Sequence, residues 1–159
     1  MNRTILFTPV GGTDPISSTN GHDGSMLHIC RQYKPDEVVL YMSKEMLDFQ
    51  EQDNRYLYCL QRLAKLQNRH MDYKIIERRE LTKVHEFDYF YNDFRTIIMD
   101  IYKNMDGKSL IMNDKMQHRG EHRSVAKGLE QAFELLVDAL ADGALAEAVA
   151  AGNEKGRHQ

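Results

Sequence analysis

The stretch TILFTPVGGTDP, residues 4–15, sets a short apolar run directly before a glycine-rich loop. The apolar run predicts a buried strand over 4–7. Further apolar runs at 38–42 (VVLYM), 73–77 (YKIIE) and 109–112 (SLIM) predict three more strands, with helical patterns between them. Because apolar strands that alternate with helices form a parallel sheet covered on both faces, we expect an α/β, Rossmann-like domain.

Three stretches between these strands have the spacing of amphipathic helices. Residues 24–32 predict a short helix, which the Lys34-Pro35-Asp36 turn ends. Residues 44–68 predict one long helix that begins after Ser43 as its N-cap. Residues 86–104 predict a third helix. Its expected buried side consists of Phe87, Phe90, Phe94, Ile97, Ile98 and Ile101.

The composition is that of a soluble globular chain. It has 159 residues, of which 42% are hydrophobic and 28% charged, with a net charge of -3. We find no apolar run near the roughly 18 residues of a membrane span and no signal peptide at the start. Two cysteines without a CxxC spacing fit free thiols in a reducing cytoplasm. The negative charge argues against binding of long nucleic acid, which needs a basic surface.

The composition changes near residue 115. Residues 1–115 contain one alanine and all eight tyrosines, whereas residues 116–159 contain nine alanines. We therefore treat 1–115 as a ligand-binding domain and 116–159 as an Ala-rich helical segment, with a helix over 124–142, a shorter one over 144–151 and a disordered tail over 152–159. A fusion, a frameshift and an engineered replacement all remain open as the origin of this segment.

The loop after the first strand carries the groups suited to ligand binding. Gly11 and Gly12 let the backbone approach a ligand closely. Thr13 offers a hydroxyl, and Asp14 can accept from a ribose hydroxyl or an amine. The helix that starts at 24–25 would turn its N-terminal amides toward a phosphate. The alternative interpretation is that this loop is a plain connection between strand and helix, in which the glycines only relieve steric crowding. The spacing is not GxGxxG, so a dinucleotide cofactor is not expected.

Several segments together resemble a known family. They are ILFTPVGGTDP (5–15), HDGSMLHICRQYKPDEVVLYMSKEM (22–46), DNRY (53–56), KIIER (74–78) and FDYFYNDFR (87–95). Over roughly residues 3–113 the chain is similar to the CARF domain of the Csm-type CARF–HEPN ribonucleases of type III CRISPR systems. The resemblance implies a homodimer that binds one cyclic oligoadenylate, cyclic hexaadenylate in this branch, across its twofold axis. Binding of this second messenger activates a C-terminal HEPN ribonuclease.

The resemblance also implies which residues line the ring. Those after the first strand and at the helix start are Gly11, Gly12, Thr13, Asp14, Asp23, Gly24, Ser25 and His28. Ser43 and Lys44 would contact its rim, although Lys44 could equally be a solvated residue of the first turn. His28 is alternatively a half-buried histidine of the helix. Asn113 would lie where the family has an asparagine, and Gln117 could face the site.

The chain departs from the family after residue 112. The family has a Ser-Gly-Thr-Pro type loop there, whereas this chain reads Asn113-Asp114-Lys115-Met116-Gln117. We expect no HEPN domain in this sequence. HEPN enzymes use an Arg-x4–6-His motif, and we interpret the matching spacing of Arg79 and His85 as chance. We therefore expect no ribonuclease activity by the family's route. Slow ring opening, carried by Thr13 and Asp14, is a further expectation, since it needs little beyond in-line placement of a ribose hydroxyl.

Two other functions compete with ring sensing. His118, Glu121 and His122 form an HxxEH pattern, which in zinc hydrolases supplies two histidine ligands and a base, with Glu130 or Glu134 as a third ligand. Gly120 weakens the helix that this arrangement needs. A scaffold that has lost ligand binding is the other alternative, because the loop after 112 is altered. The ring-sensing hypothesis predicts neither a metal nor a cofactor.

Overall fold

The protein folds around a parallel sheet. The computed structural model describes residues 3–12, 14–17, 20–80, 87–103, 108–113, 134–135 and 148–150. Within these residues the strand order is β3-β2-β1-β4-β5, and every neighbouring pair is parallel. The strands are β1 (Arg3–Pro9), β2 (Glu37–Ser43), β3 (Asp72–Arg78), β4 (Lys108–Met112) and β5 (Ala148–Ala150).

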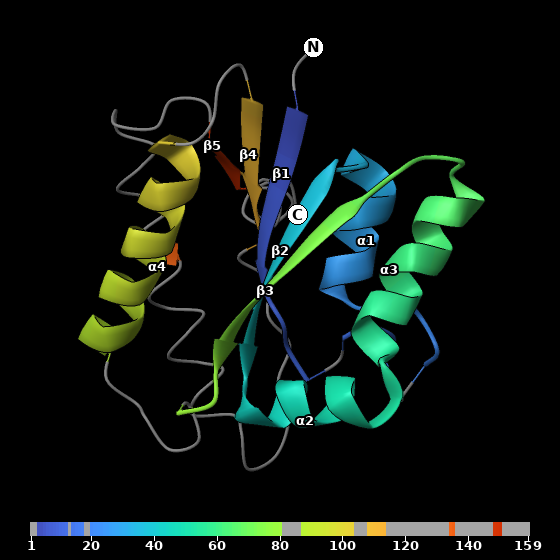
Figure 1. Cartoon of the computed structure of the whole chain (residues 1–159), viewed down its shortest axis with the longest axis horizontal. Coiled ribbons are helices and arrows are strands. Elements are labelled where there is room, and N and C mark those ends of the chain that lie inside the picture. Colours follow the sequence, from blue (N-terminus) through green and yellow to red (C-terminus); the bar gives the residue numbers. More distant parts are fainter. Residues whose placement is uncertain are drawn as a thin grey trace.

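Helices cover both faces of this sheet (Figure 1). They are α1 (Ser25–Tyr33), α2 (Lys44–Asp53), α3 (Arg55–Leu66) and α4 (Phe87–Lys103). Helices α1 and α3 lie on one face and α4 on the other, while α2 lies at the bottom of the view, where β2 ends. The predicted Rossmann-like class, a mostly parallel sheet flanked by helices, is confirmed.

Alternating side chains of the strands divide the core into two layers. Leu6 of β1 joins the buried cluster formed with α1 and α3, whereas the next residue, Phe7, packs edge-on against Phe94 of α4 with ring centroids 5.7 Å apart. Tyr41 of β2 contacts the same ring at 4.8 Å. As predicted for α4, Phe90, Phe94 and Ile98 are fully buried. Successive strand residues thus point to opposite faces of the sheet, and the helices on each face turn their apolar sides toward them.

The single helix predicted over 44–68 is wrong, because the chain divides it into α2 and α3 at Asn54. Asn54 has a left-handed backbone with φ 56°, a conformation that asparagine tolerates better than most residues. The side-chain oxygen of Gln50 then accepts from the amides of Tyr56 and Leu57 at 3.1 and 3.3 Å. A side chain of α2 therefore supplies acceptors for the first turn of α3.

The helix predicted over 144–151 is also wrong where the structure describes it. Residues 148–150 form β5, which pairs in parallel with residues 110–112 of β4. Pairing satisfies backbone groups along the outer edge of β4, and this outweighs the helix propensity of alanine. Of the helix predicted over 124–142, the structure describes Glu134 and Leu135, which are helical and exposed. The tail 152–159 lies outside the described residues.

Strand β1 extends two residues beyond the predicted run 4–7 and ends at Pro9, which is in register with Tyr41 of β2. Among the helices of the described residues, none is both long and apolar enough to cross a membrane.

The break between α2 and α3 gives a first prediction. We expect Asn54→Ala to lower the free energy of unfolding by about 1 kcal/mol, because a Cβ without a polar partner is strained at positive φ. Asn54→Gly, which removes the Cβ, should cost less. Urea unfolding measures both, with the exposed helix substitution Gln52→Ala as the control. Equal stability of Asn54→Ala and Gln52→Ala would contradict this account.

Candidate functional site

The loop between β1 and α1 folds back on itself beyond the carboxyl end of β1. The amide of Val10 first donates to the carbonyl of Tyr41 in β2 at 3.0 Å. Ile16 and Asp23 then form an isolated antiparallel bridge, the amide of Ser17 donates to the carbonyl of His22 at 2.8 Å, and Gly21 has φ +70°. The amide of Gly24 donates to the carbonyl of Pro15 at 2.9 Å. These bonds bring the start of α1 back beside the glycine pair.

Asp14 links this loop to the first turn of α1. One carboxylate oxygen, Oδ2, accepts from the amide of Gly11 at 2.8 Å, and the other, Oδ1, accepts from the amide of Met26 at 3.1 Å. The residue is 6% exposed. Burial raises the pKa of this carboxyl to about 6, although the two backbone amides act in the opposite direction. Asp14 therefore stabilises the helix start from eleven residues upstream of it.

The position of Asp14 changes what α1 can offer a ligand. Sequence reasoning expected the first amides of this helix to face a phosphate, and it expected Asp14 to accept from the ligand. In the structure the amide of Met26 already has Asp14 as its acceptor, and that of His28 donates to the carbonyl of Gly24 at 3.0 Å. Both Asp14 oxygens face backbone amides of the protein itself.

Asn113 is a second tether at the same edge of the sheet. It follows β4 directly, is fully buried, and donates from its backbone amide to the carbonyl of Phe7 at 2.9 Å. Its side-chain nitrogen Nδ2 lies 2.9 Å from Oγ1 of Thr8 and 3.1 Å from Oγ of Ser25. One side chain thus ties the ends of β1 and β4 to the N-terminus of α1. Both N–H groups of the Asn113 amide are directed into the protein.

The other predicted site residues differ in their surroundings. Gly11 is buried and Gly12 exposed. Asp23 forms an ion pair with Arg31 at 2.8 Å, so its carboxylate connects the loop to the last turn of α1. Half-buried His28 has a buried Nε2 atom without a hydrogen-bond partner among the described residues. Thr13 lies outside the described residues.

Ser43 and Lys44, the predicted rim residues, follow β2. Ser43 is the N-cap of α2, as predicted, but its side chain makes no capping hydrogen bond. The ammonium group of Lys44 forms an ion pair with Asp48 one turn later at 2.7 Å. Both residues lie at the same edge of the sheet as Gly11, because the strands are parallel.

The structure therefore brings one group of the predicted residues together. At the carboxyl edge of β1 and β4, hydrogen bonds join Gly11 to Asp14 and Ser25 to Asn113. This is where the chain order of the sheet reverses, the usual ligand position in open α/β sheets. Sequence reasoning missed Thr8, although a hydroxyl at the end of an apolar strand was the available signal.

A second polar cluster that sequence reasoning missed lies where β2 and β3 end. Arg78 contacts Asp93 of α4 with two nitrogens, at 2.8 and 2.9 Å, and the hydroxyl of Tyr41 donates to Asp93 at 2.5 Å. The guanidinium also lies over the Tyr41 ring, 5.7 Å from its centroid. This two-point ion pair fixes α4 against the sheet.

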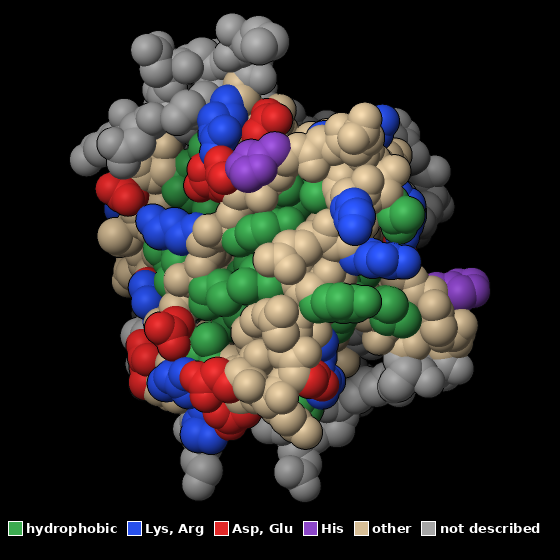
Figure 2. Space-filling view, turned by 45° about the vertical axis from the view of Figure 1, so that its right-hand side comes forward, with side chains coloured by type: hydrophobic (Ala, Val, Ile, Leu, Met, Phe, Trp, Pro, Cys, Tyr) green, Lys and Arg blue, Asp and Glu red, His purple; other side chains and the backbone are tan. Residues whose placement is uncertain are grey.

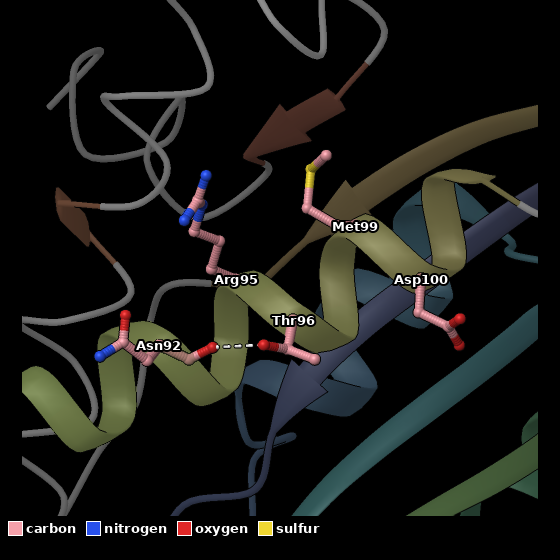
Figure 3. A pocket seen from close by; sticks show the side chains of 5 residues that line it. All are labelled: Asn92, Arg95, Thr96, Met99 and Asp100. Atoms are coloured by element: carbon pink, nitrogen blue, oxygen red, sulfur yellow. Dashed lines mark hydrogen bonds between the residues drawn. The ribbon is translucent and has the colours of Figure 1, made fainter.

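Two outer surfaces lie away from this edge. Figure 2 shows apolar side chains gathered on the face that carries α3, with basic and acidic side chains around them; Tyr58 and Leu66 are 57% and 69% exposed. A hollow of about 390 Å³ lies on the outer side of α4, where Arg95 and Met99 point to the same side (Figure 3). Asn92, Thr96 and Asp100 complete its described lining. Neither surface includes a predicted site residue.

The zinc alternative concerns a different part of the chain. Its residues His118, Glu121 and His122 lie outside the described residues, as does Gln117. Among the residues that are described, no three histidine, cysteine, aspartate or glutamate side chains form a group that could hold a metal ion.

Comparison with known proteins identifies the relatives of this chain. No family model matches it. The CRISPR system endoribonuclease Csm6 of Mycobacterium tuberculosis is 36% identical over 109 residues, which are 69% of this chain and 25% of the relative. The Csm6 of Streptococcus thermophilus is 47% identical over 57 residues, 36% of this chain and 13% of the relative. The chain is thus homologous to the Csm6 endoribonucleases over about 69% of its length, which confirms the resemblance.

A solved structure has the same fold. Enterococcus italicus Csm6 bound to cyclic hexa-2′-fluoro-hexa-dAMP matches with a TM-score of 0.62 and 22% identity, over 88% of this chain and 31% of that one. The chain spans a quarter or less of the length of the curated relatives that it matches. The likeness therefore concerns one part of those proteins.

The burial of Asp14 gives a prediction for stability against pH. Its pKa is raised from 3.8 to about 6 on folding, so the folded protein binds this proton more tightly than the unfolded chain does. The contribution of Asp14 to the free energy of unfolding should therefore be largest below about pH 4 and fall by about 3 kcal/mol as the pH rises through 6.

Urea unfolding of the wild type and of Asp14→Asn between pH 4 and pH 7 measures this contribution. The difference between the two proteins removes the effect of other groups, such as Asp72, whose pKa the hydrogen bond from Arg3 lowers. We expect the wild type to lose stability relative to the variant as the pH rises. A constant difference, or one of opposite sign, would contradict the burial argument.

Proposed function

We propose that this chain is a cyclic-oligoadenylate-sensing domain of a type III CRISPR antiviral ribonuclease, and that two copies bind one ring, cyclic hexaadenylate, across a twofold axis. The observation that carries the proposal is the set of tethered loops at the carboxyl edge of β1 and β4, in a chain homologous to Csm6. The related Enterococcus italicus protein with this fold was solved with a cyclic hexanucleotide analogue.

The chemistry of this edge suits such a ligand. A cyclic oligoadenylate presents phosphates, ribose hydroxyls and adenine edges, so it requires closely approaching backbone and short polar groups. Exposed Gly12 offers backbone without a side chain, and Ser25 and Ser43 offer hydroxyls on neighbouring elements. A twofold axis would present each of these groups twice to a symmetric ring.

The residues proposed to line the ring divide into two roles. Gly11, Gly12, Thr13, Gly24, Ser25, His28 and Ser43 are proposed to contact it. Asp14, Asp23 and Asn113 are proposed to hold those residues in place, since their described contacts lie within the protein. The unpartnered Nε2 atom of His28 supports a contact there, because a buried polar atom without a partner is costly.

Slow ring opening is part of the proposal. A ribose 2′-hydroxyl would attack its neighbouring phosphate in line, releasing the 5′-oxygen, which takes a proton, and leaving a 2′,3′-cyclic phosphate. Thr13 would be placed beside the reacting phosphate, and Asp14 would hold the loop that carries it. Such a reaction relies on placement and on donors that stabilise the developing charge.

Binding is tested by titration calorimetry with cyclic tri-, tetra- and hexaadenylate. We expect the hexaadenylate to bind most tightly, and Gly12→Glu to weaken it at least tenfold, because that change adds bulk and negative charge where phosphates would approach. Gln61→Glu adds the same charge on the exposed side of α3 and should leave the affinity unchanged. Chromatography of the incubated ring detects its opening.

Three results would overturn the proposal or its site. If no ring binds to the wild type, the chain is a scaffold without this ligand. If elemental analysis finds one zinc per chain and Glu121→Gln abolishes a hydrolase activity, the zinc alternative replaces it. If Gly12→Glu binds as the wild type does, the ring lies elsewhere on the domain.

A further inference from the structure

Thr8 is a polar residue in an apolar environment, with both its hydroxyl contacts inside the protein. It lies in β1, fully buried, between Phe7 and Pro9. Its Oγ1 lies 3.2 Å from the carbonyl of Pro9, to which it donates, and it accepts from Nδ2 of Asn113 at 2.9 Å. A buried hydroxyl costs free energy unless it is bonded, so an apolar residue of the same shape would serve the core at least as well.

The partner of Thr8 shows what the hydroxyl does there. Asn113 is separated from it by 105 residues in the sequence and lies at the first position after β4. A carboxamide can turn its oxygen or its nitrogen toward a neighbour. An acceptor at Thr8 and another at Ser25 both favour the orientation that directs the nitrogen inward.

We propose that Thr8 is a positioning residue of the ligand site, which holds the Asn113 side chain and through it the start of α1. This inference rests on the proposed function for its ligand, but the orientation of Asn113 does not depend on the ligand. Loss of the Thr8 hydroxyl leaves one buried N–H of Asn113 without its acceptor. The tie from β4 to β1 and Ser25 is then loosened at the edge where the ring would bind.

Thr8→Val tests this proposal, because valine keeps the branched shape and removes the hydroxyl. We expect at least a tenfold loss of affinity for cyclic hexaadenylate, and recovery of most of it in Thr8→Ser. Leu60→Ala, in the fully buried core under α3, is the control for lost stability. At a temperature well below both melting points, Leu60→Ala should bind the ring as the wild type does.

A second readout separates this proposal from the proposed function. The side-chain NH₂ protons of Asn113, observed by ¹⁵N-edited NMR without a ligand, should exchange slowly with water in the wild type and at least tenfold faster in Thr8→Val. Unchanged exchange would overturn the positioning role, whether or not a ring binds. Equal loss of affinity in Thr8→Val and Leu60→Ala would also overturn it. If exchange is faster in Thr8→Val but the wild type binds no ring, the proposed function is refuted and the role of Thr8 in orienting Asn113 is retained.

Discussion

The buried carboxylate of Asp14 is the interaction on which the candidate site depends. Its two oxygens join the amide of Gly11, just after β1, to the amide of Met26, in the first turn of α1. A loop of this length would otherwise meet the helix in many conformations, at a cost in conformational entropy. The bridge fixes Gly11 and Asp14 against the first turn of α1, and it places a negative charge at the positive end of the helix dipole.

A second tether extends this order across the sheet. Asn113 connects the end of β4 to Thr8 of β1 and to Ser25 at the start of α1. Strand β1 is thus held on one side by β2 and on the other by β4, and the loop that follows it is fixed at both of its ends. At the surface of this edge, Gly12 is exposed and carries no side chain. The proposed ring would therefore meet a surface formed before it arrives.

Much of this could be predicted from the sequence, for physical reasons. The apolar runs of β1 to β4 are long enough to identify buried strands, and the phenylalanine spacing of α4 identifies its buried face. The glycine pair and the DGS segment located the loop. The break at Asn54 could not be predicted from periodicity, since the apolar pattern continues through it. Pairing of β5 depends on a free edge of β4 that local propensity does not describe.

The roles within the site were harder to predict. An aspartate after a glycine pair is as compatible with ligand contact as with an internal bridge, and only the fold shows that Asp14 meets Gly11 and Met26. Thr8 and Asn113 are 105 residues apart, so their bond follows from the parallel pairing of β1 with β4. The ion pair of Arg78 with Asp93 likewise joins two segments, KIIER and FDYFYNDFR, that the resemblance had identified separately.

The stoichiometry of the complex tests the central claim most directly. Native mass spectrometry of the purified chain with cyclic hexaadenylate should show a species of two protein chains and one intact or opened ring. Its abundance should rise with ring concentration at the expense of the species without a ring. A protein that remains free of the ring at every concentration, or that takes up one ring per single chain, would contradict the shared site.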